Sequence, residues 1–284
     1  MEIINRRQRM FSISRKLRRE NKTVAFVPTM GALHEGHLSL VKEARQAADV
    51  VIVSIYVNSA QFNDKGDLER YPRDLTTDAA MLAEYEVDYV FAPEEQEIYP
   101  DGFSTYVYVE GVSEGLEGAS RPGHFRGVAT IVTILFNTVR PDKAFFGQKD
   151  AQQVAVVRRL TADLGFETEI VVLPTVREES GLAMSSRNAN LAPEEREKAS
   201  VIFKGLREAK LAFKNGERNA AKLVEIVTKI IQSEPLARMD YIAAVDSNTL
   251  EPVENIDDNE VVLAAAVYFG NVRLIDNIRL NKKQ

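Results

Sequence analysis

The sequence predicts an α/β fold: a parallel sheet with helices on both faces, followed by a smaller α+β domain. Short apolar or β-branched runs alternate with segments of helical spacing over the first part of the chain, and this alternation is typical of β-α-β units. After about Arg177 the alternation stops, and charged helical sequence followed by further strands takes its place. We therefore expect two domains, which cover residues 1–175 and 176–284.

The predicted strands of the larger domain are short and apolar, and they cover residues 24–28, 50–57, 87–91, 143–146 and 170–173. The helices predicted between them cover residues 37–48, 75–85, 128–139 and 151–164. In the smaller domain we expect a helix that begins at Pro193, a helix over 220–232, and strands over 241–245, 261–267 and 272–278. Because ligands of parallel sheets bind at the carboxyl ends of the strands, the loops that follow the strands are where a site is expected.

Composition limits the class of protein. The 284 residues are 45% hydrophobic, enough for one large core or two modest ones. No stretch approaches the ~20 apolar residues of a membrane helix, and the first residues do not resemble a secretory signal, so we expect a cytoplasmic protein without a membrane partner. The absence of cysteine excludes disulfides and thiolate metal sites. A net charge of −6 argues against nucleic acid as a partner, but not against one polyanion such as ATP.

The first segment that carries chemistry joins the first predicted strand to the first predicted helix, and it reads Pro28-Thr29-Met30-Gly31-Ala32-Leu33-His34-Glu35-Gly36-His37. Gly31 and Gly36 permit close backbone approach. His34 and His37 are three residues apart, so both can project from one face of the helix start. The helix N-terminus adds free N–H donors and partial positive charge. This combination suits phosphate groups and the charge on a departing pyrophosphate.

Two other interpretations of the histidine pair stay open, namely a metal-binding pair and two surface histidines without a function. The protein has only three histidines, and two of them lie at this one junction. No other His-rich or Cys-rich stretch offers the remaining ligands of a zinc site. Both observations favour the phosphate interpretation.

The second segment follows the predicted strand 143–146 and reads Gly147-Gln148-Lys149-Asp150, with Gln153 on the first turn of the next helix. Gly147 lets the backbone turn, and Lys149 supplies a cation for a phosphate. Asp150 is placed to cap the helix or to bind a ribose or magnesium, and Gln153 can contact a polar substrate. The alternative is a capped helix with a solvated lysine.

Three further segments contain polar groups suited to small anions. Met184-Ser185-Ser186-Arg187 combines hydroxyl groups with a guanidinium that binds oxyanions bidentately, although such a run is often an ordinary turn. Asn58 and Gln61 follow the second strand, and their amides suit the hydroxyl and carboxylate groups of a small acid, unless they only shape the loop. Residues 116–127 indicate an ordered loop over a site or a plain surface loop, in which Arg121 or Arg126 could contact an anion.

Taken in order, these segments resemble the pantothenate synthetase family, the pantoate–β-alanine ligases. The resemblance covers nearly the whole chain. It rests on Pro28 to His37, Asn58 with Gln61-Phe62, Tyr71-Pro72-Arg73-Asp74, Glu117-Gly118 to Gly127, Phe146 to Gln153, Val176-Arg177-Glu178, Met184 to Asn188 and Arg273-Leu274-Ile275-Asp276-Asn277. Several such motifs in the family's order carry far more weight than any one of them.

The resemblance implies a Rossmann-like fold of the nucleotidyltransferase type and the ATP- and magnesium-dependent joining of (R)-pantoate to β-alanine. Pantothenate, AMP and diphosphate would form through a pantoyl-adenylate. It further implies that Met30 to His37, Gly147 to Asp150, Val176 and Met184 to Arg187 bind ATP, with His37 as the proton donor. Gln61 and Gln153 would hold pantoate, and Gln61 would also reach β-alanine.

We expect His34, His37, Lys149 and Arg187 to offset charge on the reacting phosphates, Asn58 to assist substrate binding, and the C-terminal domain to act as a lid. The resemblance implies a homodimer, and no metal ligand is assigned. Two competing functions stay open: a nucleotidyltransferase that adenylates a phosphate, and a non-catalytic ATP-binding protein of the same fold.

The chain departs from the family pattern at two positions. The family usually has Asn-Pro-x-Gln-Phe where this chain has Asn58-Ser59-Ala60-Gln61-Phe62, so the loop lacks the fixed dihedral of proline. The family also often has Asp-Gly where this chain has Ser180-Gly181. Neither change removes a residue expected to take part in the chemistry.

Overall fold

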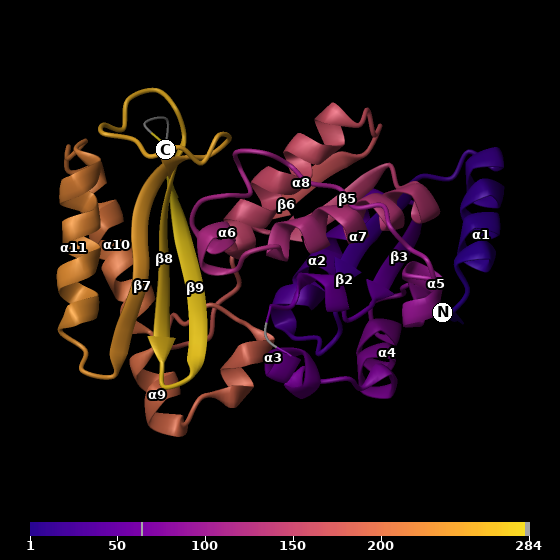
Figure 1. Cartoon of the computed structure of the whole chain (residues 1–284), viewed down its shortest axis with the longest axis horizontal. Coiled ribbons are helices and arrows are strands. Elements are labelled where there is room, and N and C mark those ends of the chain that lie inside the picture. The colour runs from indigo at the N-terminus through magenta and orange to yellow at the C-terminus, as the bar shows by residue number, and fades with distance from the viewer. Residues whose placement is uncertain (64, 282–284) are drawn as a thin grey trace. The chain divides into compact units, whose positions relative to one another are not determined.

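The computed structural model describes residues 1–63 and 65–281, and these form two compact units (Figure 1). The first unit consists of Met1–Gly147 and Val156–Leu173, and the second of Gln148–Ala155 together with the chain from Pro174 onward. The chain therefore passes between the units after Gly147, after Ala155 and after Leu173. Residues 148–155, which the sequence analysis assigned to the larger domain, group with the second unit.

The first unit is built on a six-stranded sheet in which every pairing between described strands is parallel, as predicted. Its strands in chain order are β1 (Glu2–Ile4), β2 (Val24–Thr29), β3 (Val50–Ile55), β4 (Tyr89–Phe91), β5 (Lys143–Gly147) and β6 (Glu169–Leu173), and they lie side by side in the order β1-β4-β3-β2-β5-β6. The one strand of this sheet that was not predicted is β1, a three-residue edge strand in which Ile4 alone is buried.

Helices cover both faces of the sheet. Side chains of β2 alternate between the two faces, so this one strand contacts helices on each side. Ala25 and Val27 pack in a cluster with Leu38 and Val41 of α2 (Glu35–Ala47). Between them along the strand, Phe26 makes an edge-to-face contact with Phe136 of α7 (His124–Val139), with ring centroids 6.5 Å apart. The predicted arrangement of helices on both faces is thus confirmed.

The other helices of the first unit lie at the ends of the strands or along its faces. They are α1 (Arg7–Arg19), α3 (Lys65–Arg70), α4 (Leu75–Ala83), α5 (Glu95–Ile98), α6 (Glu117–Ser120) and most of α8 (Ala151–Asp163), together with the 3-10 helix η1 (Ser59–Gln61). Helix α7 begins four residues before the predicted start, since its polar first turn does not belong to the apolar run on which the prediction rested. Sequence analysis did not predict α1, whose buried Met10, Ile13 and Leu17 are surrounded by arginine and lysine.

The connections place a reversal of strand order beside β2. Within the sheet, β3 and then β4 lie on one side of β2, whereas β5 and β6 lie on its other side. Strands β2 and β5 are parallel neighbours, with Phe26 paired to Ala144. Open α/β sheets bind ligands outside the carboxyl ends of strands at such a reversal. The segment Met30–His37 leaves β2 at this edge, and Gly147 ends β5 there.

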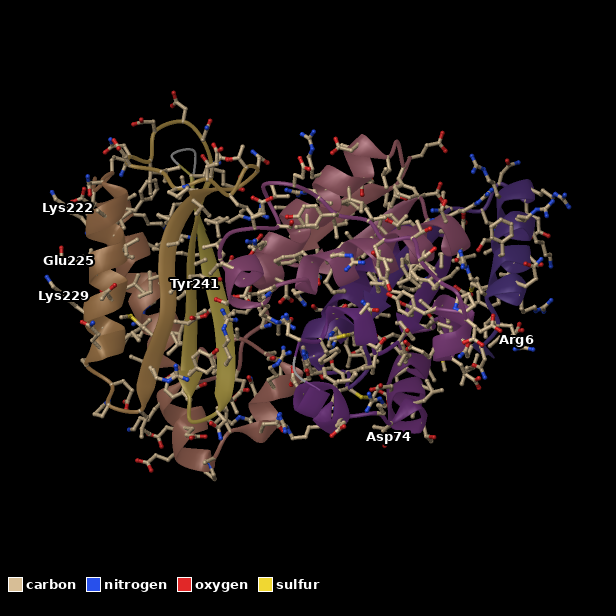
Figure 2. All side chains as sticks on the ribbon, in the orientation of Figure 1. Arg6, Asp74, Lys222, Glu225, Lys229 and Tyr241 are labelled. Atoms are coloured by element: carbon tan, nitrogen blue, oxygen red, sulfur yellow. The ribbon has the colours of Figure 1, made fainter. Side chains whose placement is uncertain are left out.

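The second unit contains an antiparallel sheet of β7 (Ala237–Asp246), β8 (Val261–Phe269) and β9 (Val272–Leu280), with helices α9 (Pro193–Lys198), α10 (Val201–Lys214) and α11 (Ala220–Gln232) and the 3-10 helices η2 (Gln148–Asp150) and η3 (Ser186–Asn190). Leu206 of α10, Leu223 and Val227 of α11 and Leu263 of β8 share one buried cluster. The opposite face of α11 carries Lys222, Glu225 and Lys229, which point outward in Figure 2.

Two features of this unit bear on the predictions. The three predicted strands and the helix over 220–232 are present, and the strands run longer than expected. The charged helix that begins at Pro193 ends at Lys198, and α10 follows as a separate helix that sequence analysis did not predict. In the part of the chain that the structure describes, no helix has the length and apolar character to cross a membrane.

Candidate active site

The loop after β2 is held in an unusual backbone conformation. Gly31 has a φ of +81° and Ala32 a φ of +51°, so two successive residues occupy the left-handed region. Such a conformation costs free energy for a residue with a Cβ and persists only where neighbouring groups enforce it. Thr29 contributes, because its hydroxyl donates to the carbonyl of Ser54 (2.7 Å) and accepts from the N–H of Gly31 (3.2 Å).

Asp78 of α4 supplies the second restraint on this loop. Its carboxylate accepts hydrogen bonds from the backbone N–H groups of Ala32 (3.0 Å) and Leu33 (2.8 Å), and only 3% of its surface is exposed. A Cβ added at Gly31 would lie 2.8 Å from a carboxylate oxygen of Asp78, so glycine is needed for this approach. Burial raises the pKa of Asp78, although the two backbone hydrogen bonds act in the opposite direction.

His34 and His37 lie together at the N-terminus of α2, as the sequence analysis expected. Their ring centroids are 4.1 Å apart, and the rings are inclined by 33°. His34 is the N-cap residue of α2, and its Nδ1 accepts a hydrogen bond from the N–H of Gly36 (3.1 Å). With Nδ1 as an acceptor, the ring proton of a neutral His34 is on Nε2, and that N–H is a donor. The pair thus adds side-chain donors to a helix start that already attracts anions.

Asn58 and Gln61 form an amide pair on the turn after β3. Asn58 Nδ2 donates to Gln61 Oε1 (2.9 Å) and to the carbonyl of Gly127 (3.2 Å), while Asn58 Oδ1 accepts from the hydroxyl of Tyr99 (2.7 Å). Gln61 Nε2 lies 3.1 Å from the sulfur of Met30. The side chains of Gln61 and Met30, both expected to bind substrates, therefore meet within the first unit.

The turn that carries the amides is packed against residues near the end of the 116–127 segment. His124 Nδ1 lies 2.8 Å from the carbonyl oxygen of Gln61, and Arg121 lies beside His124. A Cβ at Gly127 would lie 2.4 Å from the carbonyl oxygen of Ala60, so the close packing of α7 on the turn requires a glycine. Arg126, one of the two candidate anion contacts, instead places its guanidinium 3.8 Å from the ring centroid of Tyr106.

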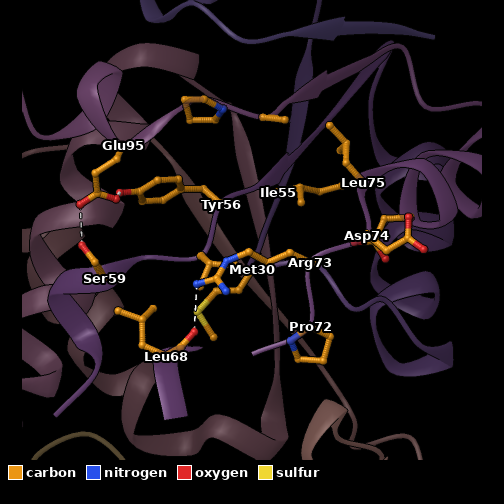
Figure 3. Close-up of a pocket in the computed structure, with 15 residues that line it drawn as sticks. Met30, Ile55, Tyr56, Ser59, Leu68, Pro72, Arg73, Asp74, Leu75 and Glu95 are labelled. Carbon is orange, nitrogen blue, oxygen red and sulfur yellow. Dashed lines mark hydrogen bonds between the residues drawn. The ribbon is translucent and has the colours of Figure 1, made fainter. Parts of the chain in front are cut away.

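A pocket of ≈ 440 Å³ lies at the carboxyl ends of β2, β3 and β4, next to this loop (Figure 3). Its walls include Met30 and Gly31, the end of β3, and the segment from Pro72 to Leu75. Asp78 also lines it, so the Asp78 carboxylate faces both this pocket and the loop that leads to the histidine pair. The pocket is mostly apolar and was not expected from the sequence.

In the second unit, the segment Gln148–Asp150 is fixed to β9 by Asn277. The amide of Asn277 donates to the carbonyl oxygens of Gln148 (3.0 Å) and Lys149 (2.9 Å), and it accepts from Gln148 Nε2 (2.8 Å). Lys149 Nζ lies 3.5 Å from Asp150 Oδ1. Asn277 was recognised in the sequence as part of a family motif, but its contact with Gln148 and Lys149 spans 128–129 residues and has no local signal.

Val176 and Met184 face each other in a short hairpin. The N–H of Met184 donates to the carbonyl of Val176 (3.0 Å), and Arg177 and Ala183 form a β-bridge. Gly181 turns the hairpin with a φ of +93°, and the Ser180 hydroxyl accepts from the N–H of Leu182 (3.3 Å). An aspartate at position 180 would form the same kind of turn. The departure at Ser180 therefore leaves the local bonding pattern intact.

A buried ion pair and a capped turn complete this group. Arg177 donates to both oxygens of Asp276 (2.6 and 2.9 Å), and its guanidinium lies 3.7 Å from the ring centroid of Phe203. Ser185 begins the turn that contains Ser186 and Arg187, and its hydroxyl accepts from the N–H of Arg187 (3.3 Å). Arg177 and Asp276 thus support the segment that carries the predicted phosphate-binding groups.

The structure brings the candidate residues together in two sets. The first unit collects Met30 to His37 with Asn58 and Gln61, and the second unit collects Gln148 to Gln153, Val176 and Met184 to Arg187. Among the described residues, no group of three or more histidine, aspartate or glutamate side chains is arranged to hold a metal ion. Sequence reasoning missed Asp78 and Tyr99, which lie far along the chain from the groups they bind.

Comparison with known proteins assigns the family. The sequence profile described as pantoate-beta-alanine ligase matches residues 2–279. A pantothenate synthetase of Heliobacterium modesticaldum is 51% identical over 98% of this chain and 99% of its own length. A crystal structure of the pantothenate synthetase of Thermus thermophilus has a TM-score of 0.92 at 44% identity, covering 98% of this chain and 99% of that one.

A second solved structure carries ligands. It is a pantoate-beta-alanine ligase of Francisella tularensis, complexed with beta-gamma ATP and β-alanine, and it has a TM-score of 0.80 at 38% identity, covering 98% of this chain and 97% of that one. The family profile spans nearly the whole sequence, and the strand-end segments stand in the family's order. The chain therefore belongs to the pantoate–β-alanine ligase family of enzymes.

Proposed function

We propose that this chain condenses (R)-pantoate with β-alanine at the expense of ATP, giving pantothenate, AMP and diphosphate through a pantoyl-adenylate. The observation that carries the proposal is the pair of rings of His34 and His37, 4.1 Å apart at the start of α2. This start follows a strand end beside the reversal of strand order. Membership of the family supports the same reaction.

In the first step, a carboxylate oxygen of pantoate attacks the α-phosphorus of ATP and diphosphate leaves with the electrons of the broken P–O bond. No nucleophile from the protein is needed, so the chain contributes positioning and electrostatic stabilisation. We assign His34, His37, Lys149 and Arg187 to the charge that develops on the phosphates, with His37 as the proton donor. Gly147 to Asp150, Val176 and Met184 to Arg187 share the binding of ATP with Met30 to His37.

In the second step, the amine of β-alanine attacks the acyl carbon, the bond to AMP breaks, and the amine gives up a proton. Gln61 and Gln153 hold pantoate, Gln61 also contacts β-alanine, and Asn58 orients the Gln61 amide. The adenylate reacts with water, so the second unit acts as a lid that excludes water while the adenylate waits for the amine.

Magnesium enters the proposal as a companion of ATP. Mg²⁺ prefers phosphate oxygens and waters with one or two carboxylates to an all-protein cage, and no such cage exists among the described residues. Asp150 is the carboxylate placed beside Lys149 that would contact it. Bound there, the ion offsets phosphate charge. We further propose that the protein is a cytoplasmic homodimer.

One assay tests the reaction. Purified protein is mixed with ATP, magnesium and D-pantoate, with and without β-alanine, and AMP and pyrophosphate are measured. AMP formation that requires both pantoate and β-alanine supports the ligase. Continued pyrophosphate release over many turnovers that needs pantoate and is indifferent to β-alanine would contradict the amine assignment, since the first step alone releases only one equivalent per enzyme. Absence of turnover would contradict the reaction as a whole.

A further inference from the structure

We propose that Tyr99 is a positioning residue that, together with the carbonyl of Gly127, holds the Gln61 amide with its nitrogen toward the substrate. Tyr99 follows α5, and it lies 41 residues from Asn58 in the sequence. Its hydroxyl contacts Asn58, and Asn58 in turn contacts Gln61. The inference rests on the proposed role of Gln61 in binding pantoate.

The direction of the hydrogen bonds follows from one group that can only accept. The carbonyl of Gly127 has no hydrogen to give, so the atom of Asn58 that faces it at 3.2 Å must be Nδ2. Nδ2 also donates to Gln61 Oε1 (2.9 Å). The oxygen of Asn58 then points toward Tyr99, whose hydroxyl donates to it over 2.7 Å. Each hydrogen of the Asn58 amide and its oxygen therefore have a partner.

This arrangement leaves Nε2 of Gln61 facing away from Asn58. Because Oε1 is engaged by Asn58, Gln61 offers N–H donors at its other end, where its neighbour is the sulfur of Met30 at 3.1 Å. A thioether is a weak acceptor, so a substrate carboxylate or hydroxyl displaces it at little cost. A carboxylate accepts hydrogen bonds and donates none, so an outward oxygen on Gln61 would repel it.

The Tyr99 hydroxyl is suited to act as a permanent donor. Its ring packs edge-to-face on Phe103, with centroids 4.9 Å apart. Burial and the nearby Glu95 and Tyr106 raise the pKa of Tyr99. The hydroxyl therefore remains protonated throughout the physiological range. Asn58 itself is buried, with 1% of its surface exposed, so water does not replace a lost donor at no cost.

The test is a double-mutant cycle between Tyr99→Phe and Gln61→Met, with the KM for pantoate, the KM for ATP and kcat measured by AMP release. In the otherwise unchanged protein, Tyr99→Phe should raise the KM for pantoate roughly tenfold, as expected for one buried hydrogen bond, and leave the KM for ATP within about twofold. In the Gln61→Met background, Tyr99→Phe should change the KM for pantoate less than about twofold, because residues that act as one unit are not additive.

Two controls keep the outcomes apart. Tyr106→Phe removes a hydroxyl from an exposed tyrosine of the same aromatic row and should leave both KM values unchanged. Asn58→Asp removes the donor to Gln61 directly, because a carboxylate cannot donate to Gln61 Oε1. This variant should raise the KM for pantoate, and the rise should disappear in the Gln61→Met background.

Equal effects of Tyr99→Phe with and without Gln61 would overturn the inference, as would equal rises in the KM values for pantoate and ATP. If Gln61→Met itself left the KM for pantoate unchanged, the proposed role of Gln61 would fail, and the role of Tyr99 with it. If the unchanged protein released no AMP, the reaction assignment would fail, and that result is seen before any variant is compared.

Discussion

Ser59 donates a hydrogen bond of 2.6 Å to the carboxylate of Glu95, and this bond fastens the turn that holds Asn58 and Gln61 (Figure 3). The other oxygen of Glu95 accepts from the hydroxyl of Tyr56 at the end of β3 (2.7 Å). Glu95 therefore links the strand end to the turn. In this chain a hydrogen bond, and not the fixed φ that a proline at position 59 would provide, restrains the turn.

Ser59→Ala should raise the KM for pantoate severalfold and lower the free energy of unfolding by about 1 kcal/mol, since one hydrogen bond to a charged group is lost. Ser59→Pro should retain both values, because proline fits the first position of a short helix and restores the restraint by another route. Steady-state kinetics and urea denaturation measure the two effects. An inert Ser59→Ala together with a damaging Ser59→Pro would contradict the role given to Ser59.

Asp78→Asn should raise the KM for ATP about tenfold and destabilise the protein by roughly 1–3 kcal/mol. The N–H groups of Ala32 and Leu33 each need an acceptor, and an asparagine offers one oxygen where the aspartate offers two. The matched control is Asp74→Asn, which weakens the exposed N-cap of α4 without touching the loop. A KM for ATP that rises equally in both variants would show that α4, and not the carboxylate of Asp78, matters.

Removal of Asp276 should cost about 3 kcal/mol of unfolding free energy, the lower end of the range for buried pairs, because the partly buried guanidinium of Arg177 is left without its counter-charge. The exposed pair of Lys229 and Glu225 on α11 provides a contrast within the same unit, and Glu225→Gln should cost less than about 0.5 kcal/mol. Urea denaturation of Asp276→Ala and Glu225→Gln measures both. Similar small losses would mean that the buried pair contributes little to this unit.

Glu178 should stabilise the protein at neutral pH and lose this contribution in acid. Burial alone would raise the pKa of Glu178, but hydrogen bonds from Arg196 and Asn188 outweigh burial and hold that pKa below the ordinary 4.5. A carboxyl group whose pKa is lower in the folded state stabilises the fold above its unfolded pKa and loses this contribution as the pH falls through its folded pKa. Glu178→Gln should therefore be less stable than the unchanged protein at neutral pH, and the difference should shrink below about pH 4.5.

The pH dependence is measured by urea denaturation at neutral pH and at several acidic values on either side of the ordinary glutamate pKa. Glu197→Gln, a change at an exposed glutamate nearby in the sequence, serves as the comparison and should cost less than about 0.5 kcal/mol at neutral pH. A stability difference for Glu178→Gln that grows as the pH falls would have the wrong sign and would refute the assignment.

His37→Ala and Lys149→Ala should each lower the rate of AMP formation by ~10²–10³ or more, as expected when a group that stabilises developing charge is lost. Folding should be unchanged, since neither side chain belongs to the buried apolar cores of the two units. Circular dichroism and AMP release are measured on the same preparations. Full turnover by either variant would remove that residue from the proposed chemistry.

Local patterns predicted most of the strands and the segments at their ends, because β-branched runs, glycines and helix starts are encoded within a few residues. The β-branched run predicted as a strand over 50–57 forms a strand from Val50 to Ile55, and the helix predicted over 220–232 runs from Ala220 to Gln232. Asp78 and Tyr99 were not predictable in this way. Their partners lie 45 or 46 and 41 residues away, and an aspartate on a helix or a tyrosine after one gives no sign of what its side chain will reach.

The path of the chain between the two units limits how this enzyme can be divided. Residues 148–155 belong to the second unit although they are flanked on both sides by the first, and Asn277 near the C-terminus bonds to two of them. A fragment cut after residue 175 would carry this segment without its partner, and the complementary fragment would carry Asn277 with nothing to bind. A chimaera that takes its C-terminal part from a homologue would therefore keep these contacts only when residues 148–155 come from the same homologue.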